Sequence, residues 1–302
     1  MNDEILCVGE ILWDALPAGL FLGGAPFNVA CHLHALGNEV HLVSRVGDDV
    51  LGREALRRLH DRGLSGDLVQ IDDEVPTGFV RVSLDDRGVP GYEIVEPAAW
   101  DFIRATPEAV ARASGASAIV FGTLAQRSMR SREALRELLR TDALKVIDLN
   151  LRPPYDDPAV IEWSLEVADV VKLSDGELDY LRDLLSLPVD PVNSLHALGE
   201  RFSLDSVCVT AGADGATLWQ QGNVFRHLGY NVRVQDTVGA GDAFLAALLT
   251  GLLRGVAGEE LLDLANRLGA FVASQSGATP AYAIDGLRDI LQLPLLQPHD
   301  AL

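Results

Sequence analysis

Short runs of valine, isoleucine and leucine alternate along this chain with longer amphipathic stretches. A run that is apolar at nearly every position is typical of a strand covered on both faces. Six such strands are predicted at residues 5–8, 40–43, 118–121, 146–149, 170–173 and 207–210. Helical patterns are predicted between them at 28–36, 53–62, 107–113, 131–140, 157–168, 175–184 and 193–201, then from 241 to 274 and near 284–291. This alternation predicts an α/β fold with a doubly wound, mostly parallel sheet flanked by helices.

A different period marks residues 76–96, where side chains alternate every second position. Val80 and Val82 fall on one face and Phe79 on the other, and turn residues at 85–88 precede an apolar return strand. This pattern predicts a β-hairpin, to which residues 12–21 could add strands. We expect a single domain over 1–302 in which a small β-sheet, formed by about 11–22 and 75–100, is a lid over a cleft. A plain edge hairpin is the simpler alternative.

Composition narrows the classes of function. The 302 residues are 48% hydrophobic, which is enough apolar material for a large core. A net charge of −20 would repel phosphate backbones and anionic lipid, so nucleic-acid and membrane-surface roles are not expected. A phosphorylated ligand must then be held by local backbone amides or a cation. Three scattered cysteines and the lack of a basic targeting segment or a long apolar run predict a cytoplasmic protein.

Two common nucleotide-binding motifs are not matched. The segment 47–54 has the glycine spacing of a P-loop but lacks its lysine and its hydroxyl residue, and the turn after Gly9 lacks the GxGxxG fingerprint. P-loop nucleotide hydrolysis and nicotinamide-dependent oxidoreduction are therefore disfavoured. His32 and His34 lie two residues apart in a predicted helix, so they point to different faces and are interpreted as structural.

The run DTVGAGDAF at 236–244 is the main candidate for chemistry. Its small residues precede an alanine- and leucine-rich segment. The amides of Gly239, Ala240 and Gly241 are therefore expected to gather at a helix N-terminus, where they can bind an anion. Asp242 would hinder a static anion site but would serve phosphoryl transfer as a base. Taken alone, the run leaves helix capping by Asp242 open as an alternative.

A second glycine cluster, GGAPFN at 23–28, also opens a predicted helix. Gly23 and Gly24 allow the backbone to approach a ligand closely, and the Asn28 amide offers a polyol both a donor and an acceptor. Asp14, after the first strand, could accept hydrogen bonds from sugar hydroxyls. Each feature alone is also common in ordinary turns and surfaces.

Together, GGAPxN near residue 25 and DTxGAGD near residue 240 resemble the two signatures of the ribokinase-like (PfkB) carbohydrate kinases. The resemblance covers nearly the whole chain and includes VGDD at 46–49, DLN at 148–150, TAGADG at 210–215 and GATP at 277–280. Through EPAAWD at 96–101 and VKLSDGE at 171–177, the chain is most similar to bacterial fructokinases. A ribokinase-like fold with a β-sheet lid and a sugar kinase activity are implied.

The resemblance also implies roles for individual residues. Asp242 corresponds to the base that deprotonates the sugar hydroxyl, and Gly239, Ala240 and Gly241 correspond to the anion hole around the transferring phosphoryl group. Contacts with the sugar are expected from Asp14, Gly23, Gly24, Asn28, Arg81, Trp100 and Arg152. The expected ATP-binding set is Asn150, Lys172, Thr210, Gly212, Gly215 and Asn266.

Two cation sites follow from the same resemblance. Glu177 would hold Mg²⁺ through water, and Ser174 stands where the metal motif of the family usually has asparagine. Serine keeps a hydroxyl but not the amide, so this position departs from the family pattern. Asp236 and the Val238 carbonyl match a monovalent-cation loop for K⁺, whose other ligands would come from 274–279.

The expected reaction is transfer of the γ-phosphoryl group of ATP to a hydroxyl of a small sugar, with fructose as the expected acceptor. The alternatives are another sugar kinase of the family, a catalytically silent sugar-binding protein, and 2-keto-3-deoxygluconate kinase. The acidic substrate of the last would need cations such as Arg81, Arg104 or Arg152. The intact Asp242 argues against the silent protein. Sugar and ATP are the expected partners, and the apolar hairpin face raises the expectation of a homodimer through the lid.

Overall fold

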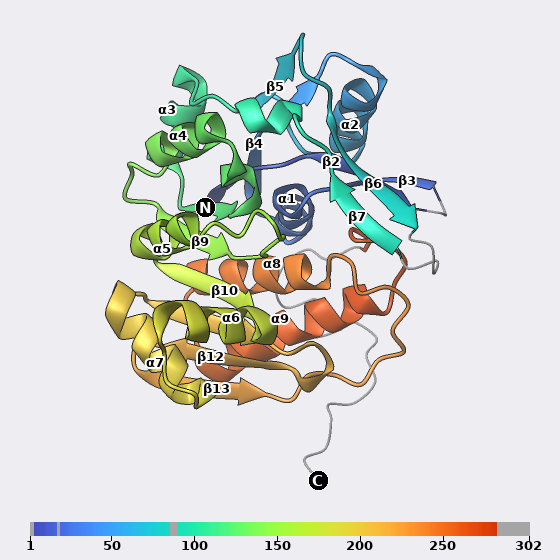
Figure 1. The fold of residues 1–302 in the computed structure, drawn as a ribbon. Helices are drawn as coiled ribbons and strands as arrows, with labels where there is room; N and C mark the ends of the chain where they lie inside the picture. Colours follow the sequence, from blue (N-terminus) through green and yellow to red (C-terminus); the bar gives the residue numbers. More distant parts are fainter. Residues whose placement is uncertain (1–2, 17–18, 85–89, 283–302) are drawn as a thin grey trace.

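Alternation along the first strand sends neighbouring side chains into two separate cores. The structure is a computed structural model that describes residues 3–16, 19–84 and 90–282 (Figure 1). In β1 (Glu4–Val8), Ile5 and Cys7 are buried in one core, whereas Leu6 and Val8 are buried in the other. A strand that is apolar at every position is therefore needed to fill the space on both sides of the sheet.

The described residues place nine strands in the larger sheet. Their order is β13 (Asn223–His227), β12 (Ala216–Gln220), β11 (Ser206–Thr210), β10 (Val170–Ser174), β9 (Leu144–Asp148), β8 (Ala118–Gly122), β1, β4 (Glu39–Gly47) and β5 (Val69–Asp72). Every pair from β11 to β5 is parallel, and β12 and β13 continue the sheet in antiparallel fashion. The predicted mostly parallel α/β sheet is confirmed.

Helices cover both faces of this sheet (Figure 1). The core on one face is filled by α1 (Ala25–Ala35), α2 (Val50–Asp61), α8 (Ala240–Leu253) and α9 (Gly258–Ala273). The core on the other face is filled by α3 (Pro107–Gly115), α4 (Met129–Leu138), α5 (Pro158–Val167), α6 (Asp175–Leu185) and α7 (Pro191–Phe202). Helix α8 is apolar nearly all round and packs between α1 and α9, which fixes the position of its first turn.

A second, four-stranded sheet projects from the carboxyl end of β1. Its order is β3 (Gly19–Gly23), β2 (Leu12–Leu16), β6 (Gly78–Leu84) and β7 (Pro90–Ile94), and β2 follows β1 almost directly along the chain. Strands β6 and β7 form the predicted hairpin, and β2 and β3 are the strands that residues 12–21 were expected to add. The hairpin turn at 85–88 and the helix expected near 284–291 lie outside the described residues.

The other helices and strands predicted within the described residues are confirmed, with their ends shifted by a few residues. All six predicted buried strands and all seven predicted helices between them are present. Strands β5, β12 and β13 were not predicted. The three cysteines are buried and unpaired, as their scattered spacing suggested. Among the described residues, no helix combines the length and the apolar character needed to cross a bilayer.

Candidate active site

Two cavities meet at the start of α8. The larger, about 760 Å³, lies between the carboxyl ends of β1 and β9, the small sheet and α1. The smaller, about 320 Å³, lies between β11, the short helix η3 (Gly212–Asp214), α8 and α9. Thr237 and Gly241 line both cavities. Because parallel strands all end at the same edge of the sheet, polar residues that follow different strands converge there.

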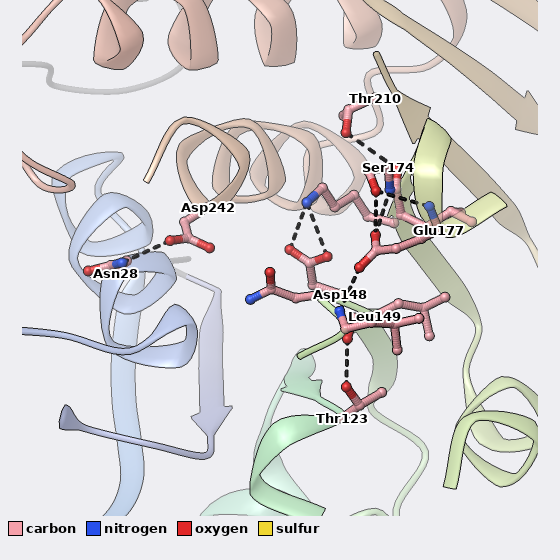
Figure 2. Close-up of polar contacts among 12 residues, drawn as sticks. Asn28, Thr123, Asp148, Leu149, Ser174, Glu177, Thr210 and Asp242 are labelled. Atoms are coloured by element: carbon pink, nitrogen blue, oxygen red, sulfur yellow. Dashed lines mark hydrogen bonds and ion pairs between the residues drawn. The ribbon is translucent and has the colours of Figure 1, made fainter. Parts of the chain in front are cut away.

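The carboxylate of Asp242 faces the larger cavity from the first turn of α8. Asn28, on α1, donates a hydrogen bond from Nδ2 to Asp242 Oδ2 at 2.8 Å (Figure 2). The N-cap of α8 is Gly239, which has no side chain, so Asp242 is not the residue at the cap position. Its side chain is directed to a neighbouring helix and a cavity, which is the placement that the base hypothesis requires.

The surroundings of Asp242 raise its pKa to about 6. Burial is the main cause, and the nearby charge of Asp148 adds to it, while the hydrogen bond from Asn28 and the positive charges of Lys172 and Arg152 act in the opposite direction. A carboxylate with this pKa is ionised at neutral pH and is more basic than an exposed aspartate. Both properties suit a general base.

A buried ion pair lies beside the first turn of α8. Lys172, from β10, donates from Nζ to both carboxylate oxygens of Asp148, at 2.8 and 3.1 Å (Figure 2). Burial by itself would lower the pKa of Lys172, but attraction to Asp148 outweighs it and the net shift is upward. A Cβ atom on Gly241 would lie 3.1 Å from Nζ, so the ammonium sits next to the turn of backbone amides. It adds a fixed positive charge there.

The turn itself has the geometry of an anion site. Gly239 adopts a left-handed φ of +79°, and α8 begins at the next residue. The first amides of a helix have no carbonyl partner within the helix and carry the positive end of its dipole. Ala240 donates its amide to the carbonyl of Thr237 at 3.3 Å, so Gly241 and Asp242 supply the first-turn amides beside the junction of the two cavities, where an anion would be stabilised.

Most of the residues expected to contact the sugar are brought together. Asp14, Gly24, Asn28 and Arg152 line the larger cavity. Gly23 is not among the described residues that line this cavity, but it lies next to Asp14: a Cβ atom on Gly23 would lie 2.8 Å from Asp14 Oδ2.

Arg81 and Trp100 are placed elsewhere. Arg81 is exposed and pairs with Glu93 at 3.2 Å, and it is not among the described residues that line the cavity. Trp100 is fully buried in the core, with the guanidinium of Arg127 3.9 Å above its ring, and it is also absent from the cavity wall. Its large aromatic surface is used for packing rather than for a ligand.

The expected ATP-binding residues divide between the two cavities. Thr210, Gly212, Gly215 and Asn266 all line the smaller one. Asn266 donates its amide Nδ2 to the carbonyl of Leu262 within α9, so that donor is already engaged. Asn150 and Lys172, by contrast, line the larger cavity.

A family model describing pfkB family carbohydrate kinases matches residues 18–284 of this chain. The chain belongs to this family. Among its relatives, a fructokinase from Escherichia coli is 30% identical, over 93% of this chain and 96% of that protein. A fructokinase from Klebsiella pneumoniae is also 30% identical over the same shares of the two chains.

Solved structures agree with this assignment to the pfkB family. The structure of fructokinase with bound ATP from Xylella fastidiosa superposes with a TM-score of 0.82 and 25% identity, covering 97% of this chain and 98% of that one. An uncharacterised sugar kinase, PH1459 from Pyrococcus horikoshii, in complex with ATP gives a TM-score of 0.78 and 26% identity, covering 95% and 97%. The ribokinase-like fold expected from the motifs is confirmed.

In this pfkB-family chain, Glu177 is committed to backbone contacts. Its Oε1 accepts from the amide of Leu151 at 2.6 Å, and its Oε2 accepts from the amide of Ser174 at 2.7 Å (Figure 2). Ser174 and Glu177 form a reciprocal capping box at the start of α6. Neither is among the described residues that line the two cavities, and no group of three or more acidic, histidine or cysteine side chains in that part of the chain could hold a metal.

The two segments expected to supply a monovalent-cation loop lie next to each other. Asp236 accepts from the amide of Val238 at 3.0 Å and from the amide of Gly277 at 3.2 Å. One carboxylate therefore ties 236–238 to the segment 274–279.

Sequence reasoning gave no role to several residues that line the site, among them Glu10, Asp148 and Thr237. Glu10, which directly follows β1 and Gly9, is buried against the larger cavity and accepts a hydrogen bond from the amide of Ala25 at 3.2 Å. Burial raises its pKa to about 7. Thr237, inside the motif, lines both cavities. The place of Glu10 at the carboxyl end of the first strand was a signal that could have found it.

Proposed function

We propose that this chain is an ATP-dependent sugar kinase with fructose as its acceptor and Asp242 as its general base. The observation that carries the proposal is the junction of two cavities at Thr237 and Gly241, with the Asp242 carboxylate in the larger one. A phosphoryl group that passes from one bound molecule to another needs such a shared boundary. The similarity to fructokinases and to an ATP-bound structure supports sugar and ATP as the two ligands.

In the proposed reaction, the sugar occupies the larger cavity and ATP the smaller. Asp242 accepts the proton of the attacking hydroxyl, while Asn28 holds one carboxylate oxygen in place. The amides at the start of α8 and the ammonium of Lys172 stabilise the charge on the equatorial oxygens of the transferring group. Magnesium carried by the nucleotide would neutralise phosphate charge. The small sheet is proposed to act as a lid that excludes water, the competing acceptor.

The charges around the larger cavity favour a neutral acceptor over an acidic one. Its described lining holds five carboxyl side chains and two cationic ones: Glu10, Asp14, Glu93, Asp148 and Asp242 against Arg152 and Lys172. Lys172 and Asp148 offset each other as a buried ion pair, which leaves four carboxyl side chains against Arg152. An acidic sugar would meet net repulsion there, whereas the hydroxyls of a neutral sugar can donate to carboxylates. This charge balance favours fructose over 2-keto-3-deoxygluconate.

An ADP-release assay with purified protein tests the proposal. Fructose, 2-keto-3-deoxygluconate, ribose and adenosine are compared as acceptors with ATP, Mg²⁺ and K⁺ present. We expect fructose to give the highest kcat/KM and the acidic sugar to be at least about tenfold worse, which corresponds to about 1.4 kcal/mol. Faster phosphorylation of the acidic sugar would refute the charge argument. Sugar binding without ADP release from any acceptor would favour the catalytically silent alternative.

A homodimer through the small sheet is proposed as well. Leu20 and Phe21, on β3, are large apolar side chains with 46% and 42% of their surface exposed. Apolar side chains on an edge strand favour pairing with a second copy. Light scattering of the wild type and of Phe21→Ser tests this point, and a monomeric wild type would refute it.

A further inference from the structure

Helix α1 contacts both the proposed base and the chain segment behind the anion turn. Asn28 donates to Asp242, and His32, four residues later, bonds the carbonyl of Ala278. Residues four apart lie on the same face of a helix. One rigid element therefore touches two parts of the site that are far apart in sequence.

The ring of His32 is fixed through both of its nitrogens. Nε2 lies 3.0 Å from the Ala278 carbonyl, and Nδ1 lies 2.5 Å from the Tyr282 hydroxyl. A carbonyl can only accept, so Nε2 carries the hydrogen and Nδ1 accepts from the hydroxyl. The two rings are stacked with centroids 5.8 Å apart, and Tyr282 packs edge-on against Phe271 of α9. The imidazole has no freedom to turn away from Ala278.

Ala278, in turn, packs directly against the anion turn. A Cβ atom on Gly239 would lie 2.3 Å from the Ala278 carbonyl oxygen, so the two backbones touch with no side chain between them. The same segment is held at its other residues, since Gly277 donates to Asp236 and the Thr279 carbonyl accepts from Arg62 at 2.9 Å. The carbonyl that His32 holds is the one that limits where Gly239 can lie.

We propose that His32 is a positioning residue for phosphoryl transfer: through Ala278 it holds Gly239, and with it the anion turn, in register with Asp242. The inference rests on the proposed function, because the turn matters only if it receives a phosphoryl group. It assigns a reaction role to a histidine that the sequence suggested was merely structural. A shift of about 1 Å in such a turn can cost about 10²-fold in rate.

The test compares His32→Leu, which keeps the bulk and removes both hydrogen bonds, with His32→Gln, which can still donate to the carbonyl. His34→Ala, on another face of α1, is the matched control. We expect His32→Leu to lower kcat about 10- to 100-fold while KM for ATP and for the sugar stays within about threefold. That split marks an interaction that matters in the transition state. His32→Gln should recover part of the loss, and the control should match the wild type.

Hydrogen exchange of the same proteins without substrate gives a readout that does not depend on turnover. Faster exchange of the amides at 237–241 and 277–280 in His32→Leu, together with the fall in kcat, supports the proposal. Unchanged exchange, or faster exchange with kcat within twofold of the wild type, overturns it. If His32→Leu does not fold, Tyr282→Phe, which removes the hydroxyl that holds Nδ1 of His32, is compared with the wild type in the same two assays, and the same outcomes support or overturn the proposal. A wild type that phosphorylates no sugar refutes the proposed function instead.

Discussion

Replacing Asp242 by asparagine should abolish most of the turnover and make the protein more stable. Asparagine has nearly the same shape, and its side-chain oxygen can still accept from Asn28, which now reaches Asp242 at 2.8 Å. The fold and the nucleotide cavity should therefore be preserved. Only the ability to accept a proton is lost. Loss of a general base costs about 10²–10⁴ in kcat, which corresponds to about 3–5 kcal/mol of transition-state stabilisation.

The gain in stability follows from the raised pKa of Asp242. Its pKa rises from an ordinary 3.8 to about 6 on folding, so the folded state binds the proton more tightly than the unfolded chain. Stability is then lost as the pH rises from about 4 to about 6, because the folded protein must give up that proton. The full shift is worth at most about 3 kcal/mol above that window. Because the carboxylate faces a cavity, we expect Asp242→Asn to gain about 1–2 kcal/mol at pH 7.5.

Three measurements check this pair of opposite effects. Initial rates with saturating ATP and sugar give kcat, titration with ATP gives nucleotide affinity, and urea denaturation gives the free energy of unfolding. Wild-type kcat/KM should rise with pH through about 6, and this limb should disappear in the variant. Asp175→Asn, an exposed carboxylate in the first turn of α6, is the matched control and should change none of them. A variant with a rate within tenfold of the wild type and an intact fold would refute the role of Asp242.

Three further predictions concern the groups around this base. Lys172→Met should lower the free energy of unfolding by about 3–5 kcal/mol because it leaves the buried Asp148 unpaired. In urea denaturation, the control Lys145→Met should lose less than about 1 kcal/mol of that free energy, because its ion pair is longer and more exposed. Equal losses would contradict the burial argument. Gly239→Ala should reduce kcat about 10²-fold, since its φ of +79° and the carbonyl 2.3 Å from the new Cβ force the anion turn to move. Steady-state rates under conditions where urea denaturation shows the variant to be folded check this, and a wild-type rate would show that the turn tolerates displacement. The stability advantage of Glu10→Gln over the wild type should grow from pH 5 to pH 8. The pKa of Glu10 is raised to about 7, so the folded wild type loses stability as that proton leaves. Thermal midpoints of both proteins at the two pH values measure this advantage, and a constant difference would argue against the raised pKa.

The buried strands could be predicted because a strand covered on both faces has apolar residues at consecutive positions. Strand β1 must be apolar at consecutive positions, since Ile5 and Leu6 enter different cores. Strands β12 and β13 escaped prediction because partly or fully exposed residues interrupt their apolar positions, and β13 lies at the edge of the sheet. Strand β5, at the other edge, is only four residues long. Edge strands lack the continuous apolar signal that central strands carry.

Which of the predicted site residues reach the cavities depends on packing between distant parts of the chain, and no local sequence pattern describes that packing. Trp100 and Glu177 both stand in segments that resemble the family, yet one is buried beneath Arg127 and the other is bonded to two backbone amides. Glu10 looked like one acid among many, and its burial against the larger cavity is visible only in the structure. A side chain's partners are set by elements that arrive from elsewhere in the chain.

The sequence by itself determined the fold class, the family and the two motifs, because strand periodicity and glycine-rich turns are local properties that their own residues encode. The tertiary structure alone decided that Asn28 reaches Asp242 across 214 positions, that two cavities share Thr237, and that His32 bonds the carbonyl of Ala278. These contacts arise because parallel strands end at one edge of the sheet, and the packing of α1 against α8 brings the two motifs together there.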